Sequence, residues 1–150
     1  MPAPERQPGD LLESRTYENL REAFASDAQA AARYSAFARR ADQEGHLDLE
    51  EIFSALARGK TEHAHGALSF LRDTADPQTR EPIKNSLEHL RSALARCLYE
   101  NETLYPGFAR TAREEGYDRA ADWFETVAAA SRRHTERLRR ELRSLEQGEA

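Results

Sequence analysis

The chain repeats the stretch Tyr34-Ser-Ala-Phe-Ala-Arg-Arg-Ala-Asp-Gln-Glu-Gly45 as Tyr105-Pro-Gly-Phe-Ala-Arg-Thr-Ala-Arg-Glu-Glu-Gly116, 71 residues later. At the same offset, His63 corresponds to His134. A repeat at this spacing predicts two helical hairpins related by approximate symmetry, and it places the two histidines at equivalent positions of one bundle. We therefore expect any chemistry to lie between these histidines.

Apolar residues recur at helical spacing, and the alternating β-branched residues typical of strands are lacking, because the sequence contains one valine and two isoleucines. Four helices are expected, over residues 16–44, 47–73, 86–116 and 118–147. Pro106 is expected to bend the third helix, since proline removes a backbone hydrogen bond. Two hairpins, 16–74 and 86–147, joined by a crossover loop over 75–85, predict an all-α, ferritin-like four-helix bundle.

Length, charge and composition limit the class of protein. The 150 residues suit one domain, and the polar, proline-rich residues 1–15 are expected to form a disordered lead-in. A net charge of -5 argues against general attraction to nucleic acid or anionic membranes, and no apolar run reaches the roughly 18 residues of a membrane span. The single cysteine, Cys97, excludes an intramolecular disulfide, so a reducing cytoplasm is expected.

Polar residues interrupt the apolar stripe of every expected helix near its middle. They are Asp27, Lys60, His63, Cys97, Glu100, Ser131 and His134. In dimetal carboxylate bundles, two helices each supply a Glu and the other two each supply a Glu-x-x-His, because residues three apart share a helix face. Here the corresponding tetrads are Lys60-Thr-Glu-His63 and Ser131-Arg-Arg-His134, which keep the histidines and lack the glutamates.

Three stretches carry a likeness to a known family. They are Glu18-Asn-Leu-Arg-Glu-Ala-Phe-Ala-Ser-Asp-Ala-Gln-Ala-Ala-Ala-Arg-Tyr34, His63-Ala-His65 and the repeat that ends at Gly116. Through them the chain resembles the rubrerythrin family over roughly residues 16 to 145. The resemblance implies a ferritin-like bundle with a non-haem diiron centre that reduces hydrogen peroxide under oxidative stress, and it makes a homodimer the expected assembly.

Family members often receive electrons from a rubredoxin-type iron site. The sequence contains no Cys-x-x-Cys pair, so we expect no rubredoxin domain here. An active protein would then depend on an external electron donor such as a rubredoxin.

The resemblance also implies the positions of the family's metal ligands. Four positions could still bind metal, namely Asp27, His63, Glu100 and His134. Three positions are altered, namely Lys60, Cys97 and Ser131, and two tyrosines, Tyr34 and Tyr105, match family tyrosines that would hydrogen-bond the metal layer. In the family both tetrad glutamates bridge the two metals, whereas here they are a cation and a hydroxyl. A charged lysine would repel divalent ions, so we expect no normal diiron centre.

Three interpretations of this altered layer stay open. The protein is metal-free, or it holds one divalent metal (iron, manganese or zinc) through Asp27, Glu100 and His63, with His134 as a fourth ligand. A single metal could retain peroxide or oxygen chemistry at a non-standard site. Alternatively, the bundle is a structural or interaction module in which Lys60 lies between Asp27 and Glu100 in place of a metal.

Individual side chains have further interpretations. Cys97 is either a small core filler or a soft zinc ligand beside His134. Lys60 or Cys97 could also have acquired a covalent or acid–base role, since burial can push a lysine towards neutrality. The many arginines of the last helix alternate with acids, which is typical of a solvated face.

Overall fold

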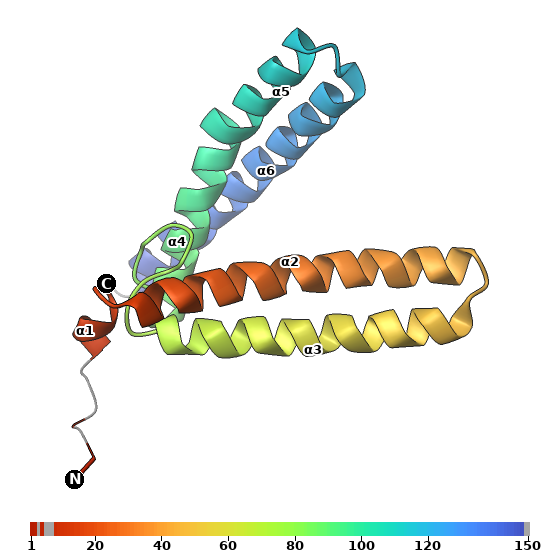
Figure 1. Cartoon of the computed structure of the whole chain (residues 1–150). Helices are drawn as coiled ribbons and strands as arrows, with labels where there is room; N and C mark the ends of the chain where they lie inside the picture. The colour runs from red at the N-terminus through yellow and green to blue at the C-terminus, as the bar shows by residue number, and fades with distance from the viewer. Residues whose placement is uncertain (3, 5–7, 149–150) are drawn as a thin grey trace. The chain divides into compact units, whose positions relative to one another are not determined.

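The computed structural model describes residues 1–2, 4 and 8–148, with the side chains of residues 8 and 9 excepted (Figure 1). Within this part of the chain all regular structure is helical, which confirms the all-α prediction. The helices divide into two compact units, residues 1–77 and 78–150, and each unit is a helical hairpin. No helix among the described residues is long and apolar enough to cross a membrane.

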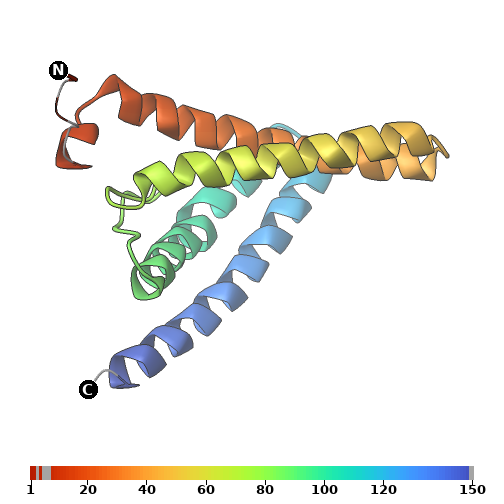
Figure 2. The ribbon, with the colours of Figure 1, turned by 90° about the horizontal axis from the view of Figure 1, so that it is seen from below.

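The first unit contains α1 (Pro8–Leu11), α2 (Arg15–Gln43) and α3 (Leu47–Leu71). Helices α2 and α3 run side by side along their whole length, as Figures 1 and 2 show from two directions. The Ser14 hydroxyl caps α2 by accepting a hydrogen bond from the Tyr17 backbone N–H at 3.1 Å. The two predicted helix ranges are therefore correct to within about two residues.

The predicted disordered lead-in differs from the structure at α1. The turn Pro8–Leu11 is helical because proline suits the first helical position, where its missing N–H has no partner to lose. The Ser14 hydroxyl also donates to the Leu11 carbonyl at 2.6 Å and closes this turn. Residues 3 and 5–7 of the predicted lead-in lie outside the described residues.

The second unit contains α4 (Ser86–Tyr99), a π-helical turn η1 (Glu100–Leu104), α5 (Tyr105–Glu114) and α6 (Asp118–Gly148). The structure corrects the prediction of one bent α-helix over 86–116. The chain widens into the π-turn just before Pro106, and the Tyr105 N–H reaches the Glu100 carbonyl five residues back. A proline ring clashes with the carbonyl four residues before it, and the wider turn relieves that clash.

The two hairpin turns have the same backbone conformation. Gly45 and Gly116 have φ of 80° and 85°, in the left-handed region that favours glycine. The N–H after each glycine closes the helix end, at 2.8 Å from His46 to the Ala41 carbonyl and at 2.7 Å from Tyr117 to the Ala112 carbonyl. The internal repeat is thus present in the structure as well as in the sequence.

Each hairpin packs one aromatic triad beside its turn. The first triad is Tyr34, Phe37 and Phe53, and the second is Tyr105, Phe108 and Phe124, 71 residues later in every case. The stacked pair in the first triad has centroids 6.4 Å apart at 21°, and the equivalent pair in the second has centroids 6.3 Å apart at 22°. Buried alanines such as Ala38 and Ala109 let the paired helices approach closely.

The π-turn absorbs one extra residue of the second repeat. The run Glu18-Asn-Leu-Arg21 recurs as Glu88-His-Leu-Arg91 at an offset of 70, whereas the repeat from Tyr34 onward has an offset of 71. One residue has therefore been gained between these two stretches, which is where η1 lies. A π-turn closes its hydrogen bond over five residues instead of four, so it accommodates the insertion without breaking the helix.

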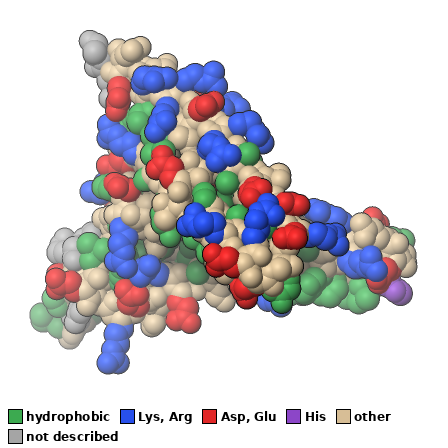
Figure 3. Space-filling model, turned by 90° about the horizontal axis from the view of Figure 1, so that it is seen from above, with side chains coloured by type: hydrophobic (Ala, Val, Ile, Leu, Met, Phe, Trp, Pro, Cys, Tyr) green, Lys and Arg blue, Asp and Glu red, His purple; other side chains and the backbone are tan. Residues whose placement is uncertain are grey.

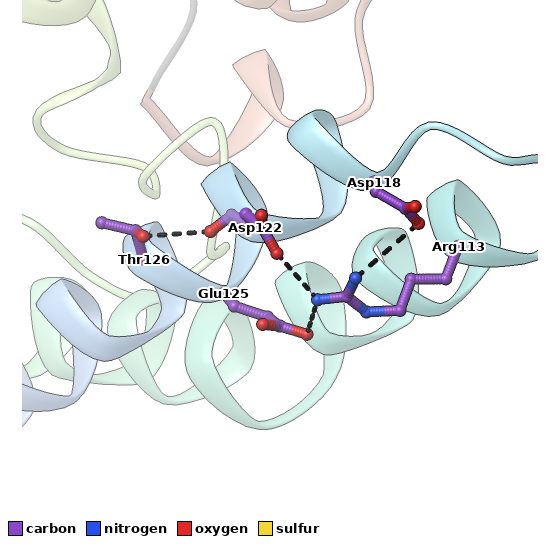
Figure 4. Close-up of polar contacts among 5 residues, drawn as sticks. All are labelled: Arg113, Asp118, Asp122, Glu125 and Thr126. Carbon is purple, nitrogen blue, oxygen red and sulfur yellow. Dashed lines mark hydrogen bonds and ion pairs between the residues drawn. The ribbon is translucent and has the colours of Figure 1, made fainter.

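Charged side chains of both signs are spread over the face shown in Figure 3, with hydrophobic patches between them. In the second hairpin, Arg113 of α5 bridges to α6 near the turn (Figure 4). Its Nη2 atom lies 3.0 Å from Asp122 and 2.8 Å from Glu125, and its Nη1 atom lies 3.9 Å from Asp118. This cluster joins the two helices at the turn end of the hairpin.

Candidate functional site

In the first hairpin, an ion pair occupies the position where the sequence predicts metal ligands. The Lys60 ammonium donates a hydrogen bond to Asp27 Oδ1 at 2.9 Å, and it joins α3 to α2. The Asp27 side chain is 19% exposed and the Lys60 side chain 34%. The predicted contact between Lys60 and Asp27 is therefore present.

The charge state of Lys60 follows from this contact. The hydrogen bond to Asp27 raises the pKa of Lys60 above its ordinary value, the charge of Asp27 raises it further, and Tyr34 adds a smaller effect in the same direction. Lys60 is accordingly an ammonium at neutral pH. This argues against an acid–base or covalent role that requires a neutral amine.

In the second hairpin, an uncharged hydrogen-bond network fills the equivalent layer. Ser131, Asn101 and Thr135 are all buried. The Ser131 hydroxyl donates to the Cys97 carbonyl at 3.0 Å, and the Asn101 amide donates to that same carbonyl at 2.7 Å and to Thr135 Oγ1 at 3.0 Å. The Thr135 hydroxyl donates to the Ser131 carbonyl at 3.0 Å. The network ties α4 and η1 to α6.

The network lies where α4 passes into the π-turn. The helical hydrogen-bond pattern changes at this junction. The Cys97 carbonyl accepts the Glu100 backbone N–H and, in addition, two side-chain donors, one from η1 and one from α6. Ser131 therefore has a structural partner in this hairpin, at the position where the family pattern places a bridging glutamate.

Glu100 has its own cation within the second hairpin. Arg96 Nε lies 3.0 Å from Glu100 Oε1, one helical turn earlier, and the Ser131 hydroxyl lies 3.4 Å from Glu100 Oε2. One interpretation of the sequence makes Lys60 a partner of this carboxylate, and that contact stays a prediction. Sequence reasoning missed Arg96 and Thr135, although each stands four residues from a predicted site residue, a spacing that places side chains together on a helix.

Cys97 is a partly buried free thiol. Burial raises its pKa, the charge of Glu100 raises it further, and the hydrogen bond with Ser131 opposes both effects. Since the thiolate is the nucleophile and the metal ligand, a raised pKa leaves Cys97 poorly suited to either role at neutral pH. The observation supports the core-filler interpretation.

His63 and His134 are exposed on their respective hairpins. Each precedes a buried residue, Ala64 in α3 and Thr135 in α6, as the repeat predicts. Among the residues that the structure describes, no three His, Cys, Asp or Glu side chains gather as a metal site would require. The predicted ligand set of Asp27, His63, Glu100 and His134 stays a prediction.

The two predicted supporting tyrosines belong to the aromatic triads. Tyr34 stacks on Phe53 and lies close enough to Lys60 to affect its pKa. Tyr105 stacks on Phe124, beside the end of the π-turn. Both rings therefore have a packing role, and Tyr34 is also coupled to a charged residue of the layer.

Comparison with known proteins identifies the same family as the sequence motifs. The family model described as Rubrerythrin matches residues 18–142. The chain is 35% identical over 139 residues to the rubrerythrin of Porphyromonas gingivalis. This alignment covers 90% of this chain and 70% of that protein. It is 32% identical over 146 residues to the rubrerythrin of Clostridium perfringens, with coverages of 92% and 75%. Identity to the rubrerythrin of Nitratidesulfovibrio vulgaris is 32% over 142 residues, with coverages of 92% and 74%.

Proposed function

The chain belongs to the rubrerythrin family and to its ferritin-like four-helix fold class, and from this premise we propose that an ion pair and a hydrogen-bond network replace its diiron centre. The protein is then a rubrerythrin-like bundle derived from a peroxide-reducing oxidoreductase. It is metal-free or holds at most one divalent metal. The observation that carries this proposal is the 2.9 Å contact between the Lys60 ammonium and Asp27.

The Lys60–Asp27 pair opposes metal binding in the first hairpin. A carboxylate that ligates a metal must direct a lone pair at it, and Asp27 Oδ1 already directs one at an ammonium. Lys60 also carries a positive charge that repels a divalent cation. Since its pKa is raised, the amine does not lose this charge at neutral pH.

The second hairpin supports the same proposal by a different route. A metal at Ser131 would compete with the hydrogen bond from this buried hydroxyl to the Cys97 carbonyl. A metal at Glu100 would compete with Arg96 for the carboxylate. Breaking the Ser131 contact leaves a buried polar group unsatisfied, at about 1 to 3 kcal/mol, while the Arg96–Glu100 pair is only partly buried.

A second candidate function keeps one metal. Within the described residues, neither His63 nor His134 makes a hydrogen bond or ion pair, so both imidazoles are available as ligands. With Asp27 and Glu100 they would hold iron, manganese or zinc, and iron would supply peroxide reduction. Such an enzyme would act as a homodimer and would take electrons from an external donor such as a rubredoxin.

Restoring the family's glutamates tests the proposal. The variant Lys60→Glu, Cys97→Glu, Ser131→Glu removes the ammonium and supplies three carboxylates, so it should bind more iron than the native chain after anaerobic Fe(II) loading. The matched control is Lys84→Glu, which changes the only other lysine. Circular dichroism of each variant verifies that the helices have formed.

The outcomes separate the candidates. Greater iron binding by the triple variant alone supports replacement of the diiron centre. Equal iron binding by the native chain, the control and the triple variant would contradict it. Peroxide turnover by the iron-loaded native chain, lost in His63→Ala, would favour the single-metal enzyme.

A further inference from the structure

Helix α6 carries six exposed arginines within twelve residues, here called the arginine row. They are Arg132, Arg133, Arg137, Arg139, Arg140 and Arg143. With Glu136 and Glu141, the segment 132–143 has a net charge of +4, whereas the other residues of the unit 78–150 sum to -4. The row is therefore a local concentration of positive charge in a unit whose remaining residues are acidic on balance.

Within the described part of the chain, the six arginines are unpaired. Among the described residues, none of the six forms an ion pair or a hydrogen bond, not even with Glu136 or Glu141 of the same helix. Arg96 and Arg113 of the same hairpin are paired, with Glu100 and Glu125 respectively. The acids interleaved in the sequence therefore do not neutralise the row.

The helix itself gains little from the row. Like charges three or four residues apart, such as Arg133 and Arg137, destabilise a helix. The helix dipole favours cations only in the last turn, and α6 continues to Gly148, beyond the end of the row. The repulsion among these arginines therefore lowers the stability of α6, and a bound anion would reduce that repulsion.

Three arginines of the row lie on the side of α6 opposite the residues that pack inside the hairpin. At 100° per residue, Arg133 and Arg140 lie on roughly the opposite side of α6 from the buried Ser131. Arg137 lies between them on the same outer face. This face takes no part in the hydrogen-bond network of the hairpin.

We propose that the arginine row is a docking surface for an acidic protein. Guanidinium groups bind carboxylates in a bidentate manner, and three of them at positions i, i+4 and i+7 present a line of such forks. The row rises only about 17 Å along the helix. A compact acidic patch can match this length and avoid the surrounding acids of the unit.

A nucleic acid fits the row less well. A long polyanion would extend past the row over acidic surface, and repulsion acts within a screening length of about 8 Å at physiological salt. The overall charge of -5 adds to this repulsion. The inference concerns the outer face of α6 and does not depend on the state of the metal layer.

The test measures binding of a fluorescently labelled oligoglutamate peptide to the full chain by anisotropy. We expect binding that weakens with salt and that falls about tenfold in the variant Arg133→Gln, Arg137→Gln, Arg140→Gln, since each exposed pair contributes modestly. The matched control, Arg39→Gln, Arg58→Gln, Arg119→Gln, has the same net charge and should bind as the native chain does.

Several results would overturn the proposal. They are no binding of the peptide, an equal loss in the control variant, or equally tight binding of an oligothymidylate of the same charge. Self-association in analytical ultracentrifugation that disappears in the row variant would identify a second copy as the occupant and would also overturn it. Circular dichroism of both variants verifies that α6 is intact.

Discussion

At the scale of single residues, two substitutions change the chemistry of the layer in different ways. Lys60 places a fixed positive charge beside Asp27, while Ser131 places a neutral donor beside the Cys97 carbonyl. Under our proposal, the first repels a metal, and the second offers a hydroxyl that serves structure where the family pattern has a carboxylate. The polar groups of this layer are thus paired by an ion pair in the first hairpin and by neutral hydrogen bonds in the second.

The Lys60–Asp27 pair predicts how stability depends on pH. Because the pKa of Lys60 is higher in the folded chain, the pair stabilises the fold fully below the ordinary lysine pKa, and this contribution is lost as pH rises through the folded value. Urea unfolding should show the native chain more stable than Lys60→Met by a constant margin from about pH 7 to about pH 10, with the margin shrinking above it. A margin that vanished between about pH 7 and 9 would contradict the pairing.

Cys97 should react slowly. Its pKa is raised mainly by burial, so less thiolate is present near neutral pH than for a free cysteine. Reaction with a disulfide reagent should be slower in the folded chain than in denaturant, and its pH midpoint should lie above about 8.5. Ser131→Ala should slow it further, because the hydrogen bond from Ser131 lowers this pKa. Faster reaction of the folded chain than of the denatured chain would contradict the assignment.

At the scale of elements, the π-turn sets the contents of the second hairpin's layer. It holds Asn101, which binds the Cys97 carbonyl and Thr135 together. The first hairpin has no such turn among its described residues, and its layer contains an ion pair instead. The two hairpins are otherwise similar. The one with the inserted residue contains a hydrogen-bond network in this layer, and the other contains an ion pair.

Removing the Asn101 side chain should destabilise the second hairpin. Asn101→Ala deletes two hydrogen bonds in a buried setting, and the expected loss is about 1 to 3 kcal/mol in the free energy of unfolding. Glu102→Ala changes an exposed residue of the same π-turn and is the matched control, with an expected change of about 0.5 kcal/mol or less. Equal losses of unfolding free energy in both variants would contradict a stabilising role for the Asn101 hydrogen bonds.

At the scale of the whole molecule, the internal repeat predicted more than any other feature. The 71-residue offset predicted both hairpins, since helical periodicity is a local property, and in the structure the glycine turns and the aromatic triads recur at the same offset. The π-turn was not predicted from that offset. Its signal lies in the 70-residue offset between Glu18 and Glu88, because the change from 70 to 71 marks one inserted residue.

The candidate site was predictable only in part. The contact between Lys60 and Asp27 followed from the family positions, because those positions face each other across a hairpin. The partners Arg96 and Asn101 did not, because each depends on how a side chain turns at the junction between α4 and the π-turn. Sequence spacing predicts on which face of a helix a residue lies. Which of the nearby side chains it contacts depends on its rotamer and on the packing around it.

We propose that protein contacts stand in place of the two metals of a diiron centre in this molecule. The most direct test is the iron content of the native chain after anaerobic Fe(II) loading and removal of free metal. We expect no more than about one iron per chain, because Lys60 stays charged and Glu100 is already paired with Arg96. Tight binding of two irons by each native chain would contradict it.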